Sequence, residues 1–436
     1  MRKIIQYMMM ALIAVVLASC ANDISEESTP TVKSNIRFVV DDFPMFEKPS
    51  TRTIGEEDKG KTAWAVGDEI CVKLESKELG TQTATLKYNG VKFELQDGNS
   101  LGYLEDEPVT AYAYYAPNRK WLNDGNLGYK DGEHDGTAEL LEATCTVHYG
   151  DDNYIDISFA TATRNYSRLR IATMPNKPIT VDINYFTPAG SSDMKWDQNY
   201  ALTSDEKGNA YLYGTFENNS EVTVKYREAP LKTYTFSQAT ESAKSYALDA
   251  TVVSLTDEGI TRDQIVENVK KELDAGKTYI NLMLAPDADE ETLDAIHIGL
   301  AGASYGTINL TLIGCKKIPS GGFMYWKILK SIALPDVTEI AEKAFLDCTG
   351  LQKVVLGNLT KVYGKAGEKG IFEGCRTKDI DLVLSKDQKV MNGGETEGGY
   401  CWTADITKDY SGSDEHNGRV FLDYDFQSIT CVYPVP

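Results

Sequence analysis

The four histidines are the first residues to test for catalytic or metal chemistry. They lie far apart along the chain, and no two of them have the spacing of zinc ligands: His134, His148, His297 and His416. The HExxH, GxSxG, Walker A and GxGxxG patterns are also missing from the sequence. We therefore predict that the protein is not an enzyme and that it has no metal site and no cofactor.

Oxygen ligands gather at one place, from Asp409 to Glu415. This spacing is typical of a calcium loop, but the segment lacks the full EF-hand pattern. We therefore interpret it as a solvated turn.

The cysteines after Cys20 are odd in number and form no CxxC pair: Cys71, Cys145, Cys315, Cys348, Cys375, Cys401 and Cys431. A chain of this size needs no disulfide to hold its core, so most of them are expected to be buried apolar side chains. Cys401 and Cys431 share the terminal segment and are the first pair to test for a disulfide, although sequence cannot fix the connectivity.

Two aromatic clusters are candidates for ligand binding. Tyr325 and Trp326 stand together in one cluster, and Tyr400 and Trp402 form the other. Aromatic rings anchor interfaces because they bury much area at a small entropic cost. Two interpretations stay open: the rings bind a sugar or a protein partner, or they pack in the core or in a terminal cap.

The first twenty residues predict export. Arg2 and Lys3 precede an apolar run from Met8 to Ala18, which is too short to span a bilayer. The end of this stretch, Leu17-Ala18-Ser19-Cys20, resembles the lipobox of bacterial lipoproteins. The resemblance implies a signal peptide over residues 1–19 and acylation of Cys20, for example with palmitate, which would anchor the mature chain in a bilayer. The alternative is ordinary secretion with a free cysteine at position 20.

An acidic, polar stretch follows the lipidation site. Residues 20–33 have little to bury and are expected to form a flexible tether. Asn22 to Glu27 resembles the acidic signal that directs some Gram-negative lipoproteins to the outer face of the outer membrane, and a plain solvated spacer is the alternative. The formal net charge of −21 repels phosphate backbones, which argues against a nucleic-acid partner.

From residue 34 to residue 255 the pattern is that of β-strands. Short runs rich in β-branched and aromatic residues are bounded by Gly, Asn and Asp, and Asn89-Gly90 predicts a hairpin. The expected strands are Ile36–Val40, Glu69–Leu74, Thr83–Tyr88, Val91–Leu95, Val109–Tyr115, Ile155–Phe159, Leu169–Thr173, Ile179–Tyr185, Ala210–Phe216 and Glu221–Tyr226. We predict two antiparallel β-sandwich domains, at 34–163 and 164–255.

Three motifs in this region resemble those of fimbrillin-like proteins, which are lipoproteins with two transthyretin-like β-sandwiches that form or decorate surface fimbriae. They are Ser50-Thr51-Arg52-Thr53, Trp64 to Ile70 and Tyr112 to Pro117. In fimbrillin-like proteins a short connection leads from the first domain into the second. The segment Ile157-Ser158-Phe159, followed by Ser167-Arg168-Leu169-Arg170-Ile171, resembles that connection. The resemblance covers about half of the chain.

The resemblance also implies a role for Arg52. In the polymerising relatives a protease cuts after an arginine early in the first domain, which removes a strand and opens a groove for a neighbour's donor strand. Arg52 matches that position, and the alternative is an exposed loop residue without this role.

The pattern changes after Thr256. Thr261 to Gln264 reads as a capping box, and Ile265, Val269 and Leu273 lie on one helical face. The sequence then predicts a strand over 279–284, a second helix over 288–301 and a strand over 308–313.

A repeat follows these elements. Leu312 to Phe323 aligns with Leu334 to Phe345 at a shift of 22 residues, and a third copy runs from Leu356 to Phe372 with a five-residue insertion. A period of 22 is typical of leucine-rich solenoids. Ala344 to Leu351 and Ile371 to Cys375 resemble the BspA-like leucine-rich repeat, a family of adhesive surface proteins.

These observations predict a mainly β protein with a C-terminal α/β part: two antiparallel sandwiches, a helical entry with a short leucine-rich-repeat solenoid over 256–384, and a cap over 385–436. The expected function is that of an outer-membrane, lipid-anchored adhesin or fimbria-associated protein that faces the cell exterior. Its partners would be fimbrial subunits and host or bacterial surface proteins or glycans. A fimbrial tip or anchor subunit and a glycan-binding protein are the alternatives.

Overall fold

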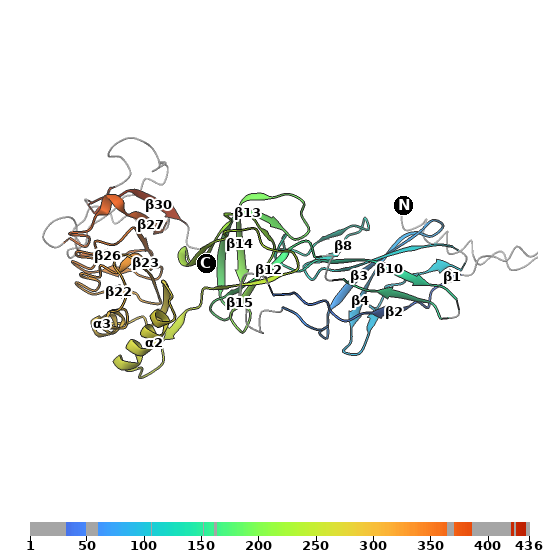
Figure 1. Cartoon of the computed structure of the whole chain (residues 1–436), viewed down its shortest axis with the longest axis horizontal. Coiled ribbons are helices and arrows are strands. Elements are labelled where there is room, and N and C mark those ends of the chain that lie inside the picture. The colour runs from blue at the N-terminus through green and yellow to red at the C-terminus, as the bar shows by residue number, and fades with distance from the viewer. Residues whose placement is uncertain are drawn as a thin grey trace, which may run out of the picture.

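The computed structural model describes residues 32–48, 60–105, 107–150, 152–160, 164–363, 370–385, 420–422 and 424–432. Its β-rich parts follow one another along an elongated molecule (Figure 1). In the described part no helix is long and apolar enough to cross a membrane. The mainly β character with a C-terminal helical part is confirmed.

The first large sheet is built from residues 37–157. Its strand order is β2 (Arg37–Val40), β11 (Tyr154–Ile157), β10 (Leu141–His148), β7 (Thr110–Tyr115), β3 (Glu69–Ser76), β4 (Gly80–Tyr88) and β5 (Phe93–Leu95). Two small pairs lie beside it: β1 (Val32–Lys33) with β6 (Tyr103–Leu104), and β8 (Arg119–Trp121) with β9 (Leu127–Tyr129). Alternation places apolar side chains such as Ile70, Val72 and Leu74 on the core side.

The second large sheet follows directly in the chain. Its order is β17 (Ala229–Thr235), β16 (Glu221–Tyr226), β13 (Pro178–Pro188), β15 (Asn209–Phe216), β12 (Ser167–Ala172) and β18 (Ser245–Asp249), and β14 (Lys195–Thr203) pairs with β13. Neither of the first two sheets is purely antiparallel, which corrects the prediction. β2 runs parallel to β11, and β18 runs parallel to β12; the strands of each pair lie far apart in the chain, as parallel neighbours must.

The third large sheet is parallel throughout. Its order is β19 (Val253–Leu255), β20 (Tyr279–Leu284), β21 (Ile308–Ile313), β23 (Leu329–Leu334), β25 (Lys353–Leu356), β27 (Asp381–Ser385) and β30 (Ser428–Val432). A second row of short parallel strands contains β22 (Lys317–Ile318), β24 (Glu339–Ile340) and β26 (Lys361–Val362). A 3₁₀ turn, η3 (Thr377–Asp379), and the pair β28 (Val420–Phe421) with β29 (Tyr424–Asp425) complete this part, which we call the parallel array.

The register of the parallel array repeats along the sequence. Asn309 pairs with Ser331 and Ser331 with Lys353, each step covering 22 residues. The repeat aligned from sequence is therefore a step from one strand to its neighbour. β30 extends the same sheet beyond β27, so part of the predicted cap is a strand of the array.

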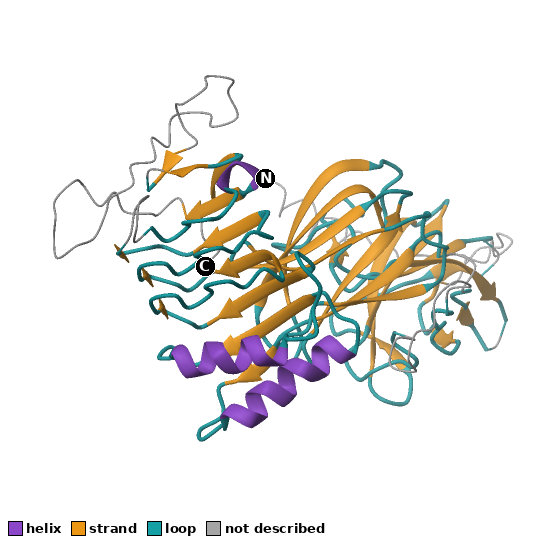
Figure 2. Cartoon of the chain, turned by 60° about the vertical axis from the view of Figure 1, so that its left-hand side comes forward, coloured by secondary structure: helices purple, strands orange, loops and turns teal. Residues whose placement is uncertain are grey.

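Two helices cover the first end of the array (Figure 2). α2 (Arg262–Asp274) begins at the predicted capping box, in which the Thr261 side chain accepts from the Gln264 amide and the Gln264 side chain accepts from the Thr261 amide. α3 (Glu290–Gly299) packs closely on α2, because a Cβ on Gly299 would lie 2.7 Å from the Val269 Cβ. The helices cover the apolar side chains at the end of the array, where no further repeat packs on them.

Candidate functional site

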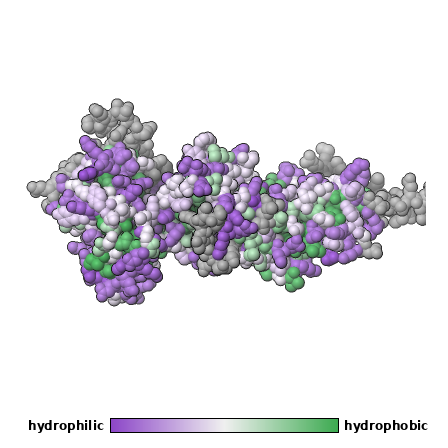
Figure 3. All heavy atoms as spheres, viewed as in Figure 1, coloured by the Kyte–Doolittle hydropathy of each residue, from purple (hydrophilic) through white to green (hydrophobic). Residues whose placement is uncertain are grey.

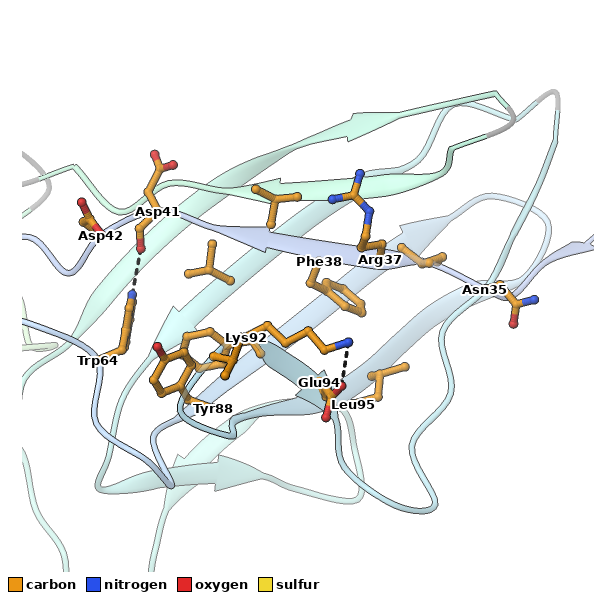
Figure 4. Close-up of a pocket in the computed structure, with 15 residues that line it drawn as sticks. Asn35, Arg37, Phe38, Asp41, Asp42, Trp64, Tyr88, Lys92, Glu94 and Leu95 are labelled. Carbon is orange, nitrogen blue, oxygen red and sulfur yellow. Dashed lines mark hydrogen bonds and ion pairs between the residues drawn. The ribbon is translucent and has the colours of Figure 1, made fainter.

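The first sheet leaves two strand edges open toward each other. β2 and β5 are the ends of its strand order, and in the described chain β2 pairs only with β11 and β5 only with β4. A groove of about 820 Å³ lies between them (Figure 4). Open strand edges are sites for pairing with another chain, so this groove is the candidate functional site.

The backbone of β2 turns half of its hydrogen-bonding groups toward the groove. The amides of Arg37 and Asp41 donate to carbonyls beside β11, which assigns these residues to the β11 side. In a parallel pair successive residues face opposite sides, so the amide and carbonyl of Phe38 and Val40 point toward β5.

The backbone of β5 does the same from the other wall. The Asn89 amide donates to the Lys92 carbonyl, and the Gln96 amide donates to the Thr85 carbonyl, so the even-numbered residues face β4. Phe93 and Leu95 therefore direct their backbone groups into the groove.

The groove is narrower than an added strand requires. Some Cα atoms of β2 and β5 lie within 8 Å of each other. Paired strands are about 4.8 Å apart, so a strand bonded to both edges needs about 9.6 Å. A simple insertion would therefore require the edges to separate, whereas the replacement of β2 would not.

Aromatic rings form the floor and one end of the groove. Trp64 lies edge-on to Phe43 and Phe93, with ring centroids 4.8 and 4.9 Å away, and its Nε1 donates to the Asp41 carbonyl over 2.8 Å. This hydrogen bond fixes the chain where it leaves β2 (Figure 4).

Two exposed valines lie beside this end of the groove. Val66 is 76% exposed and Val91 is 86% exposed, and a Cβ on Gly90 would be 3.2 Å from Val66, which places the two valines close together. Apolar side chains exposed at a groove are consistent with a partner surface.

The segment after β2 ties the first sheet to the second. Phe43 and Phe46 are buried, and Arg164 lies over the Phe46 ring with its guanidinium carbon 4.1 Å from the centroid. The Arg164 guanidinium also donates to the carbonyls of Pro44 and Met45. Glu47 forms an ion pair with Lys244. We call Phe43 to Glu47 the strap.

Several residues singled out from the sequence lie outside the described structure. These are Cys20, Arg52, Tyr400 and Trp402, together with Cys401 and the segment 409–415. The strap ends five residues before Arg52, and the described chain resumes at Gly60.

The remaining two predicted binding residues have opposite surroundings. Tyr325 is 53% exposed, whereas Trp326 is 3% exposed and stacks on His297 at 4.5 Å between ring centroids. Trp326 therefore packs in the core, which was the alternative interpretation, and the hypothesis that its ring faces a ligand is wrong.

The repeat contains the signal that sequence reasoning missed. Trp326 stands three residues after Phe323, as Cys348 and Cys375 stand three after Phe345 and Phe372. The three phenylalanine rings stack at centroid distances of 5.4 and 5.1 Å. The third residue after each stacked phenylalanine therefore packs on the core: Trp326 and Cys348 are buried, and Cys375 is partly buried.

The described cysteines have packing roles. Cys71, Cys145, Cys315, Cys348 and Cys375 are free thiols. Burial raises the pKa of Cys71 to about 11 and that of Cys375 to about 12, so these thiols stay protonated at neutral pH. The Sγ atoms of Cys348 and Cys375 lie 2.9 Å from the carbonyls of Phe323 and Phe345. Within the described residues no group of histidine, cysteine and carboxylate side chains could hold a metal ion.

Comparisons with known proteins identify no family. No protein-family model and no curated protein matches the chain. Two structures of variants of the shaft pilin SpaA from Lactobacillus rhamnosus GG align with 50% of this chain and 95% of their own, at 9% identity and TM-scores of 0.19 and 0.17. TM-scores this low do not establish a shared fold.

Proposed function

We propose that this protein is a fimbria-associated surface subunit whose first sheet accepts a strand of another subunit in place of β2. One observation carries the proposal: β2 is a short parallel edge strand that faces an open groove, and all of it precedes Arg52. A cut after Arg52 would separate β2 and the strap covalently from the rest of the sheet.

The buried side chains of β2 and the strap set the affinity that a donor strand must match. Ile36, Phe38, Phe43 and Phe46 are the buried apolar side chains of this segment, and each contributes about 1.5–3 kcal/mol. The Arg37–Asp152 ion pair is exposed and adds little. A donor strand that places apolar side chains at the same alternate positions, and runs antiparallel to β11, would bind the vacated edge at least as well.

Cleavage of the folded chain at position 52 tests this proposal. The intact chain should remain a monomer, whereas the cleaved chain, after washing out residues 21–52, should bind a peptide of residues 34–47 and self-associate as its concentration rises. The same peptide with Phe38→Asp is the matched control and should not bind. A cleaved chain that stays folded and monomeric and does not bind the peptide would refute strand replacement.

A second function, adhesion through the parallel array, rests on a different observation. Exposed apolar side chains gather where its turns meet the end of α3: Ile298, Tyr305, Met324 and Tyr325. Figure 3 shows hydrophobic patches over the parallel array and over the first sheet, on a face that is hydrophilic over most of its area. On this interpretation the array is a leucine-rich-repeat solenoid of the BspA-like kind, held outward by the two sheets.

The adhesion proposal is tested with the whole chain. Tyr305→Ser and Tyr325→Ser should weaken retention on immobilised matrix proteins, bacterial surfaces or glycans. Trp196→Ser is the control, since Trp196 is an equally exposed aromatic residue on the second sheet. Equal loss in all three variants would indicate nonspecific apolar adsorption.

We further propose that acylation of Cys20 anchors the protein on the outer face of the outer membrane. The support is the sequence of the export signal and of the acidic stretch behind it. Labelling with palmitate should be lost in Cys20→Ser, and protease treatment of intact cells should remove the parallel array. Full protection from the protease would place the protein in the periplasm instead.

A further inference from the structure

The second sheet leaves one edge of β14 open in the part of the chain that the structure describes. β14 pairs there only with β13. The two strands that end the main order of this sheet meet other parts of the molecule instead. Ala229 of β17 packs on the parallel array, and Lys244, just before β18, forms a bridge with Glu47 of the strap. β14 therefore offers a free edge to which a further strand can be added.

Alternate residues of β14 direct their backbone groups toward this free edge. The Ser204 amide donates to the Lys177 carbonyl over 3.1 Å, which places Ser204 on the β13 side. In an antiparallel pair successive residues face opposite sides, so Tyr200 and Leu202 also bond to β13. The residues between them point their amides and carbonyls away from β13, and we call them the edge residues: Asp197, Asn199, Ala201 and Thr203.

The free edge lacks the features that usually protect an edge strand. All four edge residues are exposed, and the register with β13 is unbroken from Asp197 to Thr203. β14 is nine residues long and has no proline, and its charged residues, Lys195 and Asp197, lie near its first end. Monomeric proteins usually blunt such an edge with a bulge, a proline or a charge, so this edge is well suited to pairing.

We propose that β14 pairs with β14 of a second copy of this chain, in antiparallel orientation and centred on Tyr200. Two identical strands that pair in this way are related by a two-fold axis, so one contact satisfies the edges of both chains. In this register Asn199 faces Ala201 of the second copy, and Asp197 faces Thr203. All the edge residues then pair, which gives about eight backbone hydrogen bonds.

The charges along the strand favour this register and this partner. Lys195 comes opposite Asp205 of the second copy at each end of the pair, so opposite charges meet. A shift that sets Ala201 opposite Ala201 would bring Asp197 opposite Asp205, and like charges that lie directly opposite are destabilising. The charge pattern is thus complementary to itself, which argues for a second copy rather than an unrelated strand.

The dimer should be weak. A contact made by one strand from each chain belongs to the size class of transient interfaces. We therefore expect a monomer at about 1 µM, where the intact and cleaved chains are compared, and a dimer at about 100 µM. Pairing through β14 requires no cleavage at Arg52, because β14 lies outside β2 and the strap. In the Ala201→Pro background only strand replacement can cause self-association, so the two proposals fail separately.

Sedimentation equilibrium of residues 21–436 between about 1 and 200 µM tests the pairing. The unaltered chain should dimerise over this range. Ala201→Pro removes an amide that faces the second copy and none that faces β13, so it should raise the dimer Kd at least about tenfold. Ala201→Ser keeps this amide and is the matched control, with unchanged dimerisation.

A second variant guards against misfolding. Ala201→Lys places a charge on the free edge without altering the backbone, and it should weaken the dimer as Ala201→Pro does. It replaces the proline variant if thermal unfolding shows that the latter is not folded.

Cysteine cross-linking tests the register. Hydrogen-bonded neighbours in an antiparallel pair have Cα atoms about 5.5 Å apart, within the range that a disulfide spans. A mixture of Asn199→Cys and Ala201→Cys chains should therefore form a disulfide-linked dimer under mild oxidation, whereas either variant alone should form much less.

Three results would overturn the proposal. A normally folded chain that stays a monomer at about 200 µM would leave the edge to a strand of a different protein. Equal dimerisation of the Ala201→Ser, Ala201→Pro and Ala201→Lys chains would place the contact on another surface. Preferential cross-linking of Ala201→Cys to itself would move the centre to Ala201 and refute the register.

Discussion

The Arg164 guanidinium donates to the Glu139 carboxylate in the interior between the first two sheets. The Arg164 side chain is fully buried and that of Glu139 is 6% exposed, and the Arg164 Nε atom lies 2.7 Å from the carboxylate oxygen. The same arginine holds the strap through the carbonyls of Pro44 and Met45. The ion pair therefore connects both sheets to the segment that precedes Arg52.

Loss of one partner of this pair should be costly. Glu139→Gln would leave the Arg164 charge buried without its counter-ion, and we expect the free energy of unfolding to fall by about 3–5 kcal/mol. Urea unfolding measures the change. The double variant Glu139→Leu, Arg164→Met should recover much of it, because no uncompensated charge remains. A double variant less stable than Glu139→Gln would show that the carbonyl contacts of Arg164 matter more than its charge.

Tyr325 has a backbone conformation that suits glycine. Its φ is +66°, and the equivalent positions in the next two copies, Asp347 and Gly374, have φ values of +56° and +73°. An L-residue in this region costs about 1–2 kcal/mol. Because the Tyr325 side chain is half exposed, Tyr325→Gly should leave the free energy of unfolding unchanged or raise it by up to about 1 kcal/mol.

A neighbouring residue provides the control for that substitution. Lys327 is exposed and is not among the residues with positive φ, so Lys327→Gly should be destabilising. If both glycine variants lose the same stability, then Tyr325 is not strained. If Tyr325→Gly is stable but loses surface binding, then the strained tyrosine has a role in recognition.

His297 should make stability depend on pH. Burial lowers the pKa of its imidazole, and the Asp294 carboxylate opposes this only in part. The unfolded chain therefore binds the proton more readily, with a pKa of about 6.5. Stability from the neutral ring is complete above that value and is lost as the pH falls through the folded-state pKa.

Unfolding in guanidinium chloride between pH 7.5 and pH 5 measures the effect. This range extends about one unit or more on either side of the unfolded-state pKa of about 6.5. His297→Phe keeps a ring against Trp326 and cannot titrate, so its stability should change less over this range. An identical pH dependence in both chains would assign the effect to other groups.

The sequence was most informative where a local pattern determines the structure. The capping box at Thr261 and the strand at Ile308–Ile313 were both found in this way, and the 22-residue shift equals the step between strands. β14 was missed because it is an outer strand with mixed polarity, in which Tyr200 is the only fully buried side chain.

Long-range relations could not be predicted from local patterns. The parallel pairing of β2 with β11 joins residues more than 100 positions apart, and the hydrogen bond from the Arg164 guanidinium to the Met45 carbonyl spans 119 positions. The burial of Trp326 was available from the sequence, since it occupies the repeat position of Cys348. Its aromatic character suggested a surface role, whereas its place in the repeat indicated the core.

Asp336 should determine whether the second sheet and the parallel array unfold together. Its buried carboxylate accepts from Arg227, in the turn between β16 and β17, and from the Gly314 amide over 2.9 Å. Asn281 of β20 adds a second link, since its side-chain nitrogen donates to the Leu231 carbonyl over 3.0 Å. Both links join hydrogen-bonding groups across an interface that also packs Ala229 against Ala333 and Val355.

Asp336→Ala should remove the acceptor shared by Arg227 and the part-buried Gly314 amide, at a cost of about 1–3 kcal/mol. Because the lost Arg227 contact crosses the interface, whereas the lost Gly314 contact lies within the array, we expect calorimetry to show two separate unfolding transitions where the unaltered chain shows one for these two parts. Asp379→Ala is the control, because Asp379 is exposed in η3 and is not part of the cluster that packs Ala229 against Ala333 and Val355. A single transition shifted equally in both variants would mean that Asp336 stabilises the array alone and does not couple it to the second sheet.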